Sequence, residues 1–92
     1  MTMNFDLSGK VAVITGGGGV LGSVIAKELG KQGVKVAVLG HSGTKAQEVA
    51  DEIVKDGGIA IANNVDVLNK ENLKEVRDFV VDKFGTVDIL IN

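Results

Sequence analysis

The sequence predicts an α/β fold, a doubly wound parallel sheet with strand order 3-2-1-4 and helices on both faces. Short apolar runs rich in β-branched residues alternate along the chain with longer segments in which apolar residues recur every three or four positions. Glycines or small polar residues separate most of these segments, as expected of turns. Because parallel strands need long connections, the alternation predicts helices as right-handed crossovers between neighbouring strands.

Four segments have the character of strands buried on both faces, because they are apolar and largely β-branched. The first runs directly into a series of glycines, and the second ends at Gly40. The third is less regular, since Asn63 and Asn64 interrupt it. The predicted strands are Lys10–Thr15, Val34–Leu39, Ile59–Val67 and Val87–Asn92.

Three amphipathic helices are predicted between these strands. The first covers Val20–Lys31 and is closed by Gly33; the second starts at a capping box, Thr44 to Gln47, and is stopped by Gly57-Gly58. The third follows a cap at Asn69 and ends before Gly85, with Phe79 and Val81 off its main apolar stripe. The predicted buried faces are Val20, Leu21, Val24, Ile25 and Leu29; Ala46, Val49, Ala50, Ile53 and Val54; and Leu73, Val76, Val80 and Phe84.

The composition is that of one small globular domain: 92 residues, 45% hydrophobic and 24% charged. A net charge of −2 gives no electrostatic footprint for nucleic acid or an anionic membrane. The sequence has no cysteine and one histidine, which excludes disulfides, thiolate sites and histidine-rich metal sites. No apolar run reaches the roughly 18 residues of a membrane helix, so we expect a cytoplasmic protein. Because a doubly wound sheet normally continues past its fourth strand, we expect a longer protein.

The glycine-rich stretch after the first strand is the strongest functional signal. Gly17 to Gly22 fits the pattern G-x-G-x-x-G, which combines a tight turn, close approach of backbone to a pyrophosphate, and helix-on-strand packing. Backbone N–H groups and the positive end of the following helix favour an anion there. The alternative is that the glycines form a turn that binds no ligand. The strand before them and the helix after them favour the phosphate-binding interpretation over this alternative. No lysine follows the glycines as in a P-loop, which argues against ATP hydrolysis.

The end of the second strand bears on the choice of dinucleotide. NAD-specific sites place a carboxylate there, but this chain has Gly40, His41 and Ser42, and its next carboxylate lies inside a helix. A 2′-phosphate would meet no repulsion, and His41, Ser42 or Lys45 could donate to it, which favours NADP. No arginine is present there. NAD held through the backbone and Ser42 stays open, as does a solvated turn role for His41.

Three separated motifs resemble the N-terminal part of the short-chain dehydrogenase/reductase superfamily, whose fold is of the Rossmann type. They are Leu7–Gly16 at the first strand, Asp66-Val67 after the third, and Val87–Asn92 at the fourth. The chain departs from the family pattern T-G-x-x-x-G-x-G at Val20, where the family has glycine. The sequence of residues 15–22 resembles that of the fructuronate reductase and mannonate oxidoreductase branch of this superfamily.

The resemblance implies that residues 1–92 are an NAD(P)-binding domain cut off after the fourth strand. In the family the loop backbone contacts the diphosphate, the aspartate after the third strand reaches the adenine, and the asparagine after the fourth strand lies along the cofactor. The resemblance implies the last two roles for Asp66 and Asn92. Asp66 has a competing role as a turn residue ahead of Asn69. The candidate cofactor-binding residues are Gly16, Gly18, Gly19, Val20, Leu21, Gly22, Gly40, His41, Ser42, Asp66, Val67 and Asn92.

The resemblance also implies an oxidoreductase that transfers hydride between NAD(P) and a carbonyl or secondary alcohol. Its small-molecule substrate would be a sugar acid such as fructuronate or mannonate, and the intact protein would be a homo-oligomer. The family's catalytic serine and Tyr-x-x-x-Lys pair are not matched, because the chain has no tyrosine. We therefore assign no catalytic residue and no metal ligand. The alternatives are a non-catalytic nucleotide-binding module, an inactive fragment, or a site for a flavin or another adenine nucleotide.

Overall fold

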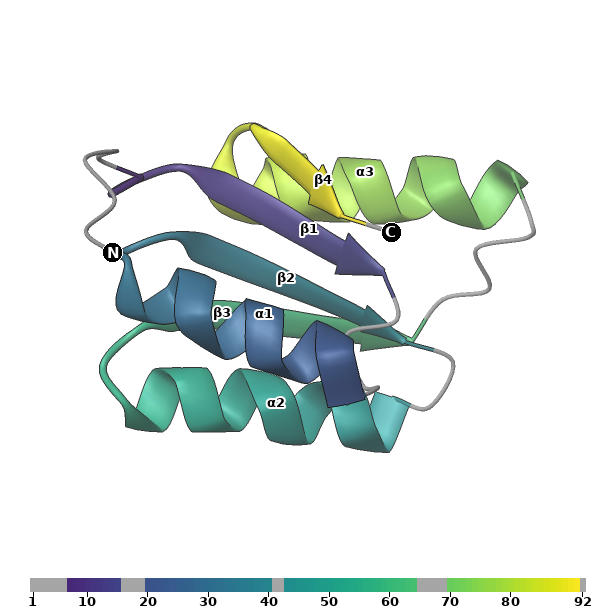
Figure 1. Ribbon diagram of the computed structural model, residues 1–92. Coiled ribbons are helices and arrows are strands. Elements are labelled where there is room, and N and C mark those ends of the chain that lie inside the picture. The colour runs from purple at the N-terminus through teal and green to yellow at the C-terminus, as the bar shows by residue number, and fades with distance from the viewer. Residues whose placement is uncertain (1–6, 16–19, 41–42, 65–69, 92) are drawn as a thin grey trace.

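The computed structural model describes residues 7–15, 20–40, 43–64 and 70–91, and strands and helices alternate along them (Figure 1). All strand pairs are parallel, and the strand order is β3-β2-β1-β4. The predicted topology is therefore confirmed. In chain order the elements are β1 (Val11–Thr15), α1 (Val20–Lys31), β2 (Lys35–Gly40), α2 (Gly43–Lys55), β3 (Ile59–Asn64), α3 (Lys70–Phe84) and β4 (Ile89–Ile91).

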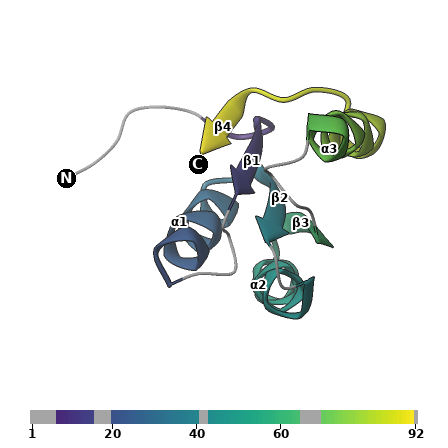
Figure 2. The same ribbon diagram turned by 90° about the vertical axis from the view of Figure 1, so that its right-hand side faces the viewer.

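The helices form two layers around the sheet. α1 and α2 lie on one face and α3 lies on the other, as the view along the strands shows (Figure 2). The connections from β1 to β2 and from β2 to β3 step across the sheet in one direction, whereas the connection to β4 steps back past β1. Right-handed crossovers in opposite directions place their helices on opposite faces. The direction of winding thus reverses between β1 and β4.

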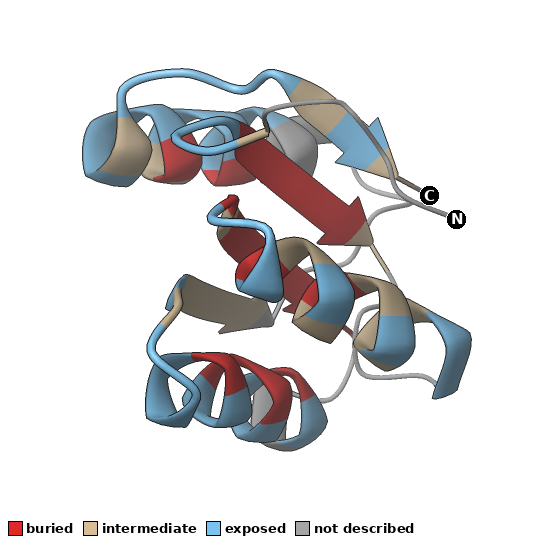
Figure 3. Ribbon diagram, turned by 60° about the vertical axis from the view of Figure 1, so that its left-hand side comes forward, coloured by how far each residue is buried: buried red, intermediate tan, exposed pale blue. Residues whose placement is uncertain are grey.

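The core is divided between these two faces, because successive side chains of a strand point to opposite sides. Ile14, Val36 and Val38 belong to the cluster beneath α1 and α2, whereas Val13 and Leu39 belong to the cluster beneath α3. β1 and β2 are covered on both sides, which explains their nearly continuous apolar sequences. β4 is only partly covered, and Figure 3 shows it in the colours of half-buried and exposed residues.

Each helix ends at a glycine in the left-handed region, as the sequence predicts. Gly33 has a φ of 84°, and the N–H of Val34 donates to the carbonyl of Leu29 at 3.1 Å, which closes the last turn of α1. Gly57 has a φ of 93° two residues past the end of α2, and Gly85 has a φ of 87° directly after α3. The predicted ends of all three helices are confirmed.

The starts of elements were predicted less well. α2 begins at Gly43, so Thr44 lies inside the helix and the prediction of Thr44 as its N-cap is wrong. β4 contains only Ile89–Ile91, because only these three residues pair with β1. The predicted strand residues 65–67, the predicted cap Asn69 and the last strand residue Asn92 lie outside the described residues.

Parts of the predicted apolar faces are exposed. Val20, Leu21 and Val24 have exposed fractions of 87%, 73% and 59%, because the described residues cover only the second half of α1, where Ala26 is buried. Val54 is exposed as well. Phe79 differs in the opposite sense. The sequence places it off the stripe of α3, yet it packs partly buried against the cluster beneath that helix. The side chain of Leu73 lies outside the described residues.

Candidate phosphate-binding edge

The carboxyl ends of β1 and β2 lie at one edge of the sheet, together with the first turns of α1 and α2 (Figures 1 and 2). Both helices therefore direct the positive ends of their dipoles, with the backbone N–H groups of their first turns, toward this edge. Gly40, the last residue of β2, is buried and carries no side chain. The edge provides the local chemistry that favours a bound phosphate.

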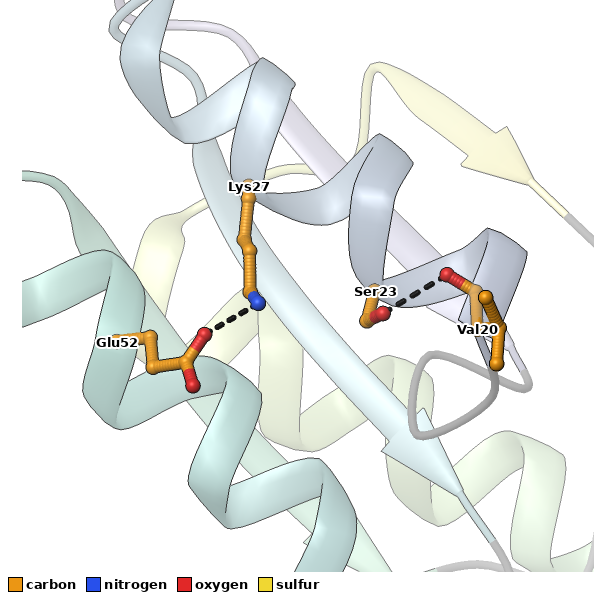
Figure 4. A network of polar contacts seen from close by, with 4 residues as sticks. All are labelled: Val20, Ser23, Lys27 and Glu52. Atoms are coloured by element: carbon orange, nitrogen blue, oxygen red, sulfur yellow. Dashed lines mark hydrogen bonds and ion pairs between the residues drawn. The ribbon is translucent and has the colours of Figure 1, made fainter.

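The first turns of α1 and α2 border a small cleft of about 210 Å³. In α1 the hydroxyl of Ser23 donates to the carbonyl of Val20 at 2.8 Å, and Lys27 forms an ion pair with Glu52 of α2 (Figure 4). The ion pair is largely exposed to solvent, so we expect it to stabilise the fold by less than about 1 kcal/mol. Its role is to join the two helices beside the cleft, which is lined by Val20, Ser23, Lys27, Lys45, Glu48, Val49 and Glu52.

Lys45 is the basic side chain nearest the start of α2 among the described residues, and it is exposed. Its charge adds to the positive end of the helix dipole at the carboxyl edge. Glu48 follows one turn later and lines the same cleft. The cleft therefore carries charges of both signs, and an anion would be favoured near Lys45 and the helix starts rather than deeper between the helices.

β4 is held against β1 by a side-chain hydrogen bond at each end of the pairing. At the start, the N–H of Val11 donates to Oδ2 of Asp88 at 2.9 Å. At the end, the hydroxyl of Thr15 donates to the carbonyl of Ile91 at 3.3 Å. Sequence reasoning missed this contact of Asp88, although a signal was available: it is the one acidic residue in the apolar run predicted as the fourth strand.

The face of the sheet beneath α3 has an apolar groove of about 520 Å³ beside β4. Leu90 projects with 64% of its surface exposed, and Val81 and Val87 are exposed by 40% and 37%. The residues that line the groove are Val13, Thr15, Leu39, Val76, Arg77, Val81, Gly85, Thr86, Val87 and Leu90. The groove borders the line between β1 and β4, where the direction of winding reverses.

We expect this groove to bind an environment-sensitive apolar dye, since exposed contiguous apolar surface takes up such probes. Leu90→Gln should reduce the fluorescence enhancement by about half or more, because it places an amide in the groove. Val54→Gln, at an exposed position of α2 outside the groove, is the control and should leave the signal unchanged. Equal losses in both variants would show that the dye binds elsewhere.

The predicted site residues fall into two groups. Val20 and Leu21 are exposed in the first turn of α1, Gly22 follows half-buried, and Gly40 ends β2, so these four lie at the carboxyl edge as expected. The remaining candidates lie outside the described residues: Gly16, Gly18, Gly19, His41, Ser42, Asp66, Val67 and Asn92. The fit of a dinucleotide therefore rests on the open edge, the two helix starts and the side-chain-free end of β2.

Two kinds of feature are absent from the described residues. No group of three or more metal-binding side chains comes together there. In the same part of the chain, no helix has the length and apolar character needed to cross a bilayer.

Solved structures with bound dinucleotides are closely similar to this chain. A candidate D-mannonate oxidoreductase of Haemophilus influenzae with bound NAD is 45% identical, with a TM-score of 0.90 over 95% of this chain and 31% of that protein. A 7α-hydroxysteroid dehydrogenase complexed with NADH and 7-oxo glycochenodeoxycholic acid is 40% identical, with a TM-score of 0.91 over 94% and 34%. A metagenomic short-chain oxidoreductase in complex with NADP is 32% identical, with a TM-score of 0.87 over 94% and 39%.

The family model for short chain dehydrogenases matches residues 10–92, so the chain belongs to the short-chain dehydrogenase family. The resemblance stated from its motifs is thereby confirmed. The chain spans about a third of the length of the first curated relatives that it matches, with 31% covered in two of them.

Proposed function

We propose that this chain is the dinucleotide-binding part of an NAD(P)-dependent oxidoreductase. The observation that carries the proposal is the position of the glycine-rich segment. It joins β1 to α1 at the carboxyl edge of a parallel sheet, beside the reversal of winding between β1 and β4. Ligands of open α/β sheets bind at this kind of edge. The dinucleotides bound in similar family members support the same proposal.

Within this proposal, the backbone of Gly16, Gly18, Gly19 and Gly22 and the first turn of α1 hold the diphosphate. Val20 and Leu21 lie against the cofactor from the exposed start of α1. The residues after β2, namely Gly40, His41 and Ser42, are placed at the adenosine ribose. Asp66, Val67 and Asn92 line the adenine and the rest of the dinucleotide.

When bound, the nicotinamide supplies hydride transfer to or from a carbonyl or secondary alcohol. The contribution of this chain to that reaction is binding and orientation, and its sequence has no tyrosine for the proton transfer that the family resemblance implies. We therefore expect these 92 residues to bind the dinucleotide without turnover. Turnover would require the further length seen in the relatives.

Titration calorimetry of the folded chain with NAD, NADH, NADP and NADPH tests the proposal directly. Gly19→Asp should weaken binding by about 100-fold or more, because it adds bulk and negative charge where backbone approaches the pyrophosphate. Gln32→Asp adds the same charge just past the other end of α1 and should change the affinity by less than about threefold. A wild-type chain that is folded and binds none of the four nucleotides would contradict the proposal for this chain.

The preference for NADP over NAD stays a prediction. The residues after β2 offer no carboxylate for a ribose 2′-hydroxyl, and Lys45 is exposed at the start of α2. The similar structures include one with NAD and one with NADP. A tenfold preference, equal to about 1.4 kcal/mol, would decide between the two in the same titration.

A sugar acid such as mannonate or fructuronate is the proposed substrate of the intact protein. The similarity to a candidate D-mannonate oxidoreductase supports it. A steroid dehydrogenase is 40% identical over nearly the same residues, so the discriminating residues must lie largely outside this part of the fold. A non-catalytic nucleotide-binding module is the second candidate, and activity of the longer protein on D-mannonate with NAD(P) would exclude it. The homo-oligomeric state and the cytoplasmic location stay predictions.

A further inference from the structure

We propose, on the basis of the proposed function, that Val20 is a specificity-determining residue that shifts the dinucleotide preference toward NAD and away from NADP. Val20 is the first residue of α1, and 87% of its surface is exposed. It is also the position at which the chain departs from the glycine of the family pattern. Packing in the core therefore gives no reason for a branched apolar side chain at this position, and we look for the reason in the bound ligand.

The side chain of Val20 borders the cleft between α1 and α2. Val20 and Ser23 line this cleft from α1, and Lys45 lines it from the first turn of α2. The hydroxyl of Ser23 donates to the carbonyl of Val20 at 2.8 Å, which holds the backbone of Val20 in the first helical turn (Figure 4). Leu21 is 73% exposed but does not line the cleft. Of these two exposed residues, Val20 is therefore the one that faces α2.

The ribose 2′ position of a bound dinucleotide is placed by this proposal at the mouth of the cleft. In dinucleotide-binding sheets, the group that contacts the ribose 2′-hydroxyl follows the second strand. Here β2 ends at Gly40 and α2 begins at Gly43, so the first turn of α2 comes directly after the strand end. β1 and β2 are neighbours in the sheet, with Thr15 opposite Leu39. The starts of α1 and α2 therefore flank the end of β2 from two sides.

The two exposed side chains at the mouth of the cleft favour different dinucleotides. The ammonium group of Lys45 and the positive end of the α2 dipole attract a 2′-phosphate. The isopropyl group of Val20 offers no hydrogen bond and displaces water from the side of the ribose that it covers. A phosphate dianion loses more by such desolvation than a neutral hydroxyl does. Val20 thus acts by penalising the competing ligand, NADP, rather than by binding NAD more tightly.

The other charges of the cleft leave this balance to the two side chains at its mouth. Lys27 is paired with Glu52, and Glu48 follows Lys45 by one turn of α2 (Figure 4). The lining thus has two lysines and two glutamates, whose formal charges cancel. A 2′-phosphate would depend on its direct contact with Lys45, because the cleft as a whole supplies no net positive charge. The polarity of the neighbouring Val20 side chain is therefore decisive.

Titration calorimetry of the full chain with NADH and NADPH tests the proposal through the ratio of the two dissociation constants. Val20→Thr keeps the branched shape and adds a hydroxyl that can donate to a phosphate. The affinity for NADPH should therefore rise about fivefold or more relative to that for NADH. Val24→Thr is the matched control, since Val24 is 59% exposed one turn further along α1 and lies outside the cleft. It should leave the ratio within about twofold of the wild-type value.

Lys45→Gln tests the position of the phosphate independently. It removes the positive charge at the mouth of the cleft and should lower the affinity for NADPH about fivefold or more relative to that for NADH. An unchanged ratio in this variant would overturn the proposal, because the 2′ position would then lie elsewhere.

An unchanged ratio in Val20→Thr would also overturn the proposal, as would an equal shift in Val24→Thr. Threonine is well tolerated at a helix start, so the variant should fold and give the circular dichroism spectrum of the wild type. A wild-type chain that binds neither NADH nor NADPH would contradict the proposed function itself. Binding of either one with ratios that do not respond to Val20→Thr would contradict only the role of Val20.

Discussion

Replacing Ile14 with alanine is expected to destabilise the protein by about 2–5 kcal/mol, the range for removing a large aliphatic side chain from a packed core. Ile14 lies in β1, is 1% exposed, and packs in the cluster beneath α1 and α2. Its neighbours across the sheet are Val38 of β2 and Ile91 of β4. Both strands restrain the backbone at this position, so the cavity would collapse only in part.

Chemical denaturation with urea, followed by circular dichroism, measures the loss for Ile14→Ala. Ile59→Ala is the matched control, since Ile59 also lies in a strand of this sheet but is 53% exposed. We expect the control to lose less than about 1 kcal/mol, mostly through its lower strand propensity. Similar losses in the two variants would mean that Ile14 is not in a packed core.

Gly30→Ala is expected to destabilise the protein although alanine is the better helix former. A Cβ atom at Gly30 would lie 2.8 Å from Cγ2 of Ile53, a side chain of α2 that is 2% exposed. Relief of this overlap requires α1 to move away from α2, at a cost of about 1–3 kcal/mol. The gain in helix propensity of about 1 kcal/mol offsets only part of that cost.

A double-mutant cycle with Ile53→Ala isolates the contact. Ile53→Ala removes the Cγ2 atom, so Gly30→Ala in that background should change sign and stabilise the protein by up to about 1 kcal/mol. The coupling free energy between the two positions should then be about 2 kcal/mol, measured by the same denaturation experiment. Additive effects would show that the close approach of α1 to α2 at Gly30 is not limiting.

The sequence predicted the structure best where the local backbone conformation strongly favours one residue type, as positive φ favours glycine. Gly33, Gly57 and Gly85 each lie just past a run of helical periodicity, and each adopts a positive φ there. Periodicity also located all seven elements. It was wrong about Val20 and Val24, because a spacing of three or four identifies an apolar face without identifying what covers it.

The candidate site was predictable where it depends on local sequence. The glycine pattern, the helix that follows it and the side-chain-free end of β2 are contiguous features, and the start of α1 and Gly40 lie at the predicted edge. The contact between Asp88 and Val11 could not be predicted in the same way. It depends on which strands become neighbours and in which register, and no local pattern contains that information.

The reversal of winding between β1 and β4 also predicts the order in which the strands pair during folding. β1 pairs with β2 through Val11 and Lys35, which one helical connection brings together, whereas β4 reaches β1 only after the chain has passed through three helices. Non-local pairings form more slowly than local ones. The unit from β1 to β3 should therefore form first and β4 should dock last. Pulse-labelling of amides during refolding should protect Val36 and Val38 before Leu90.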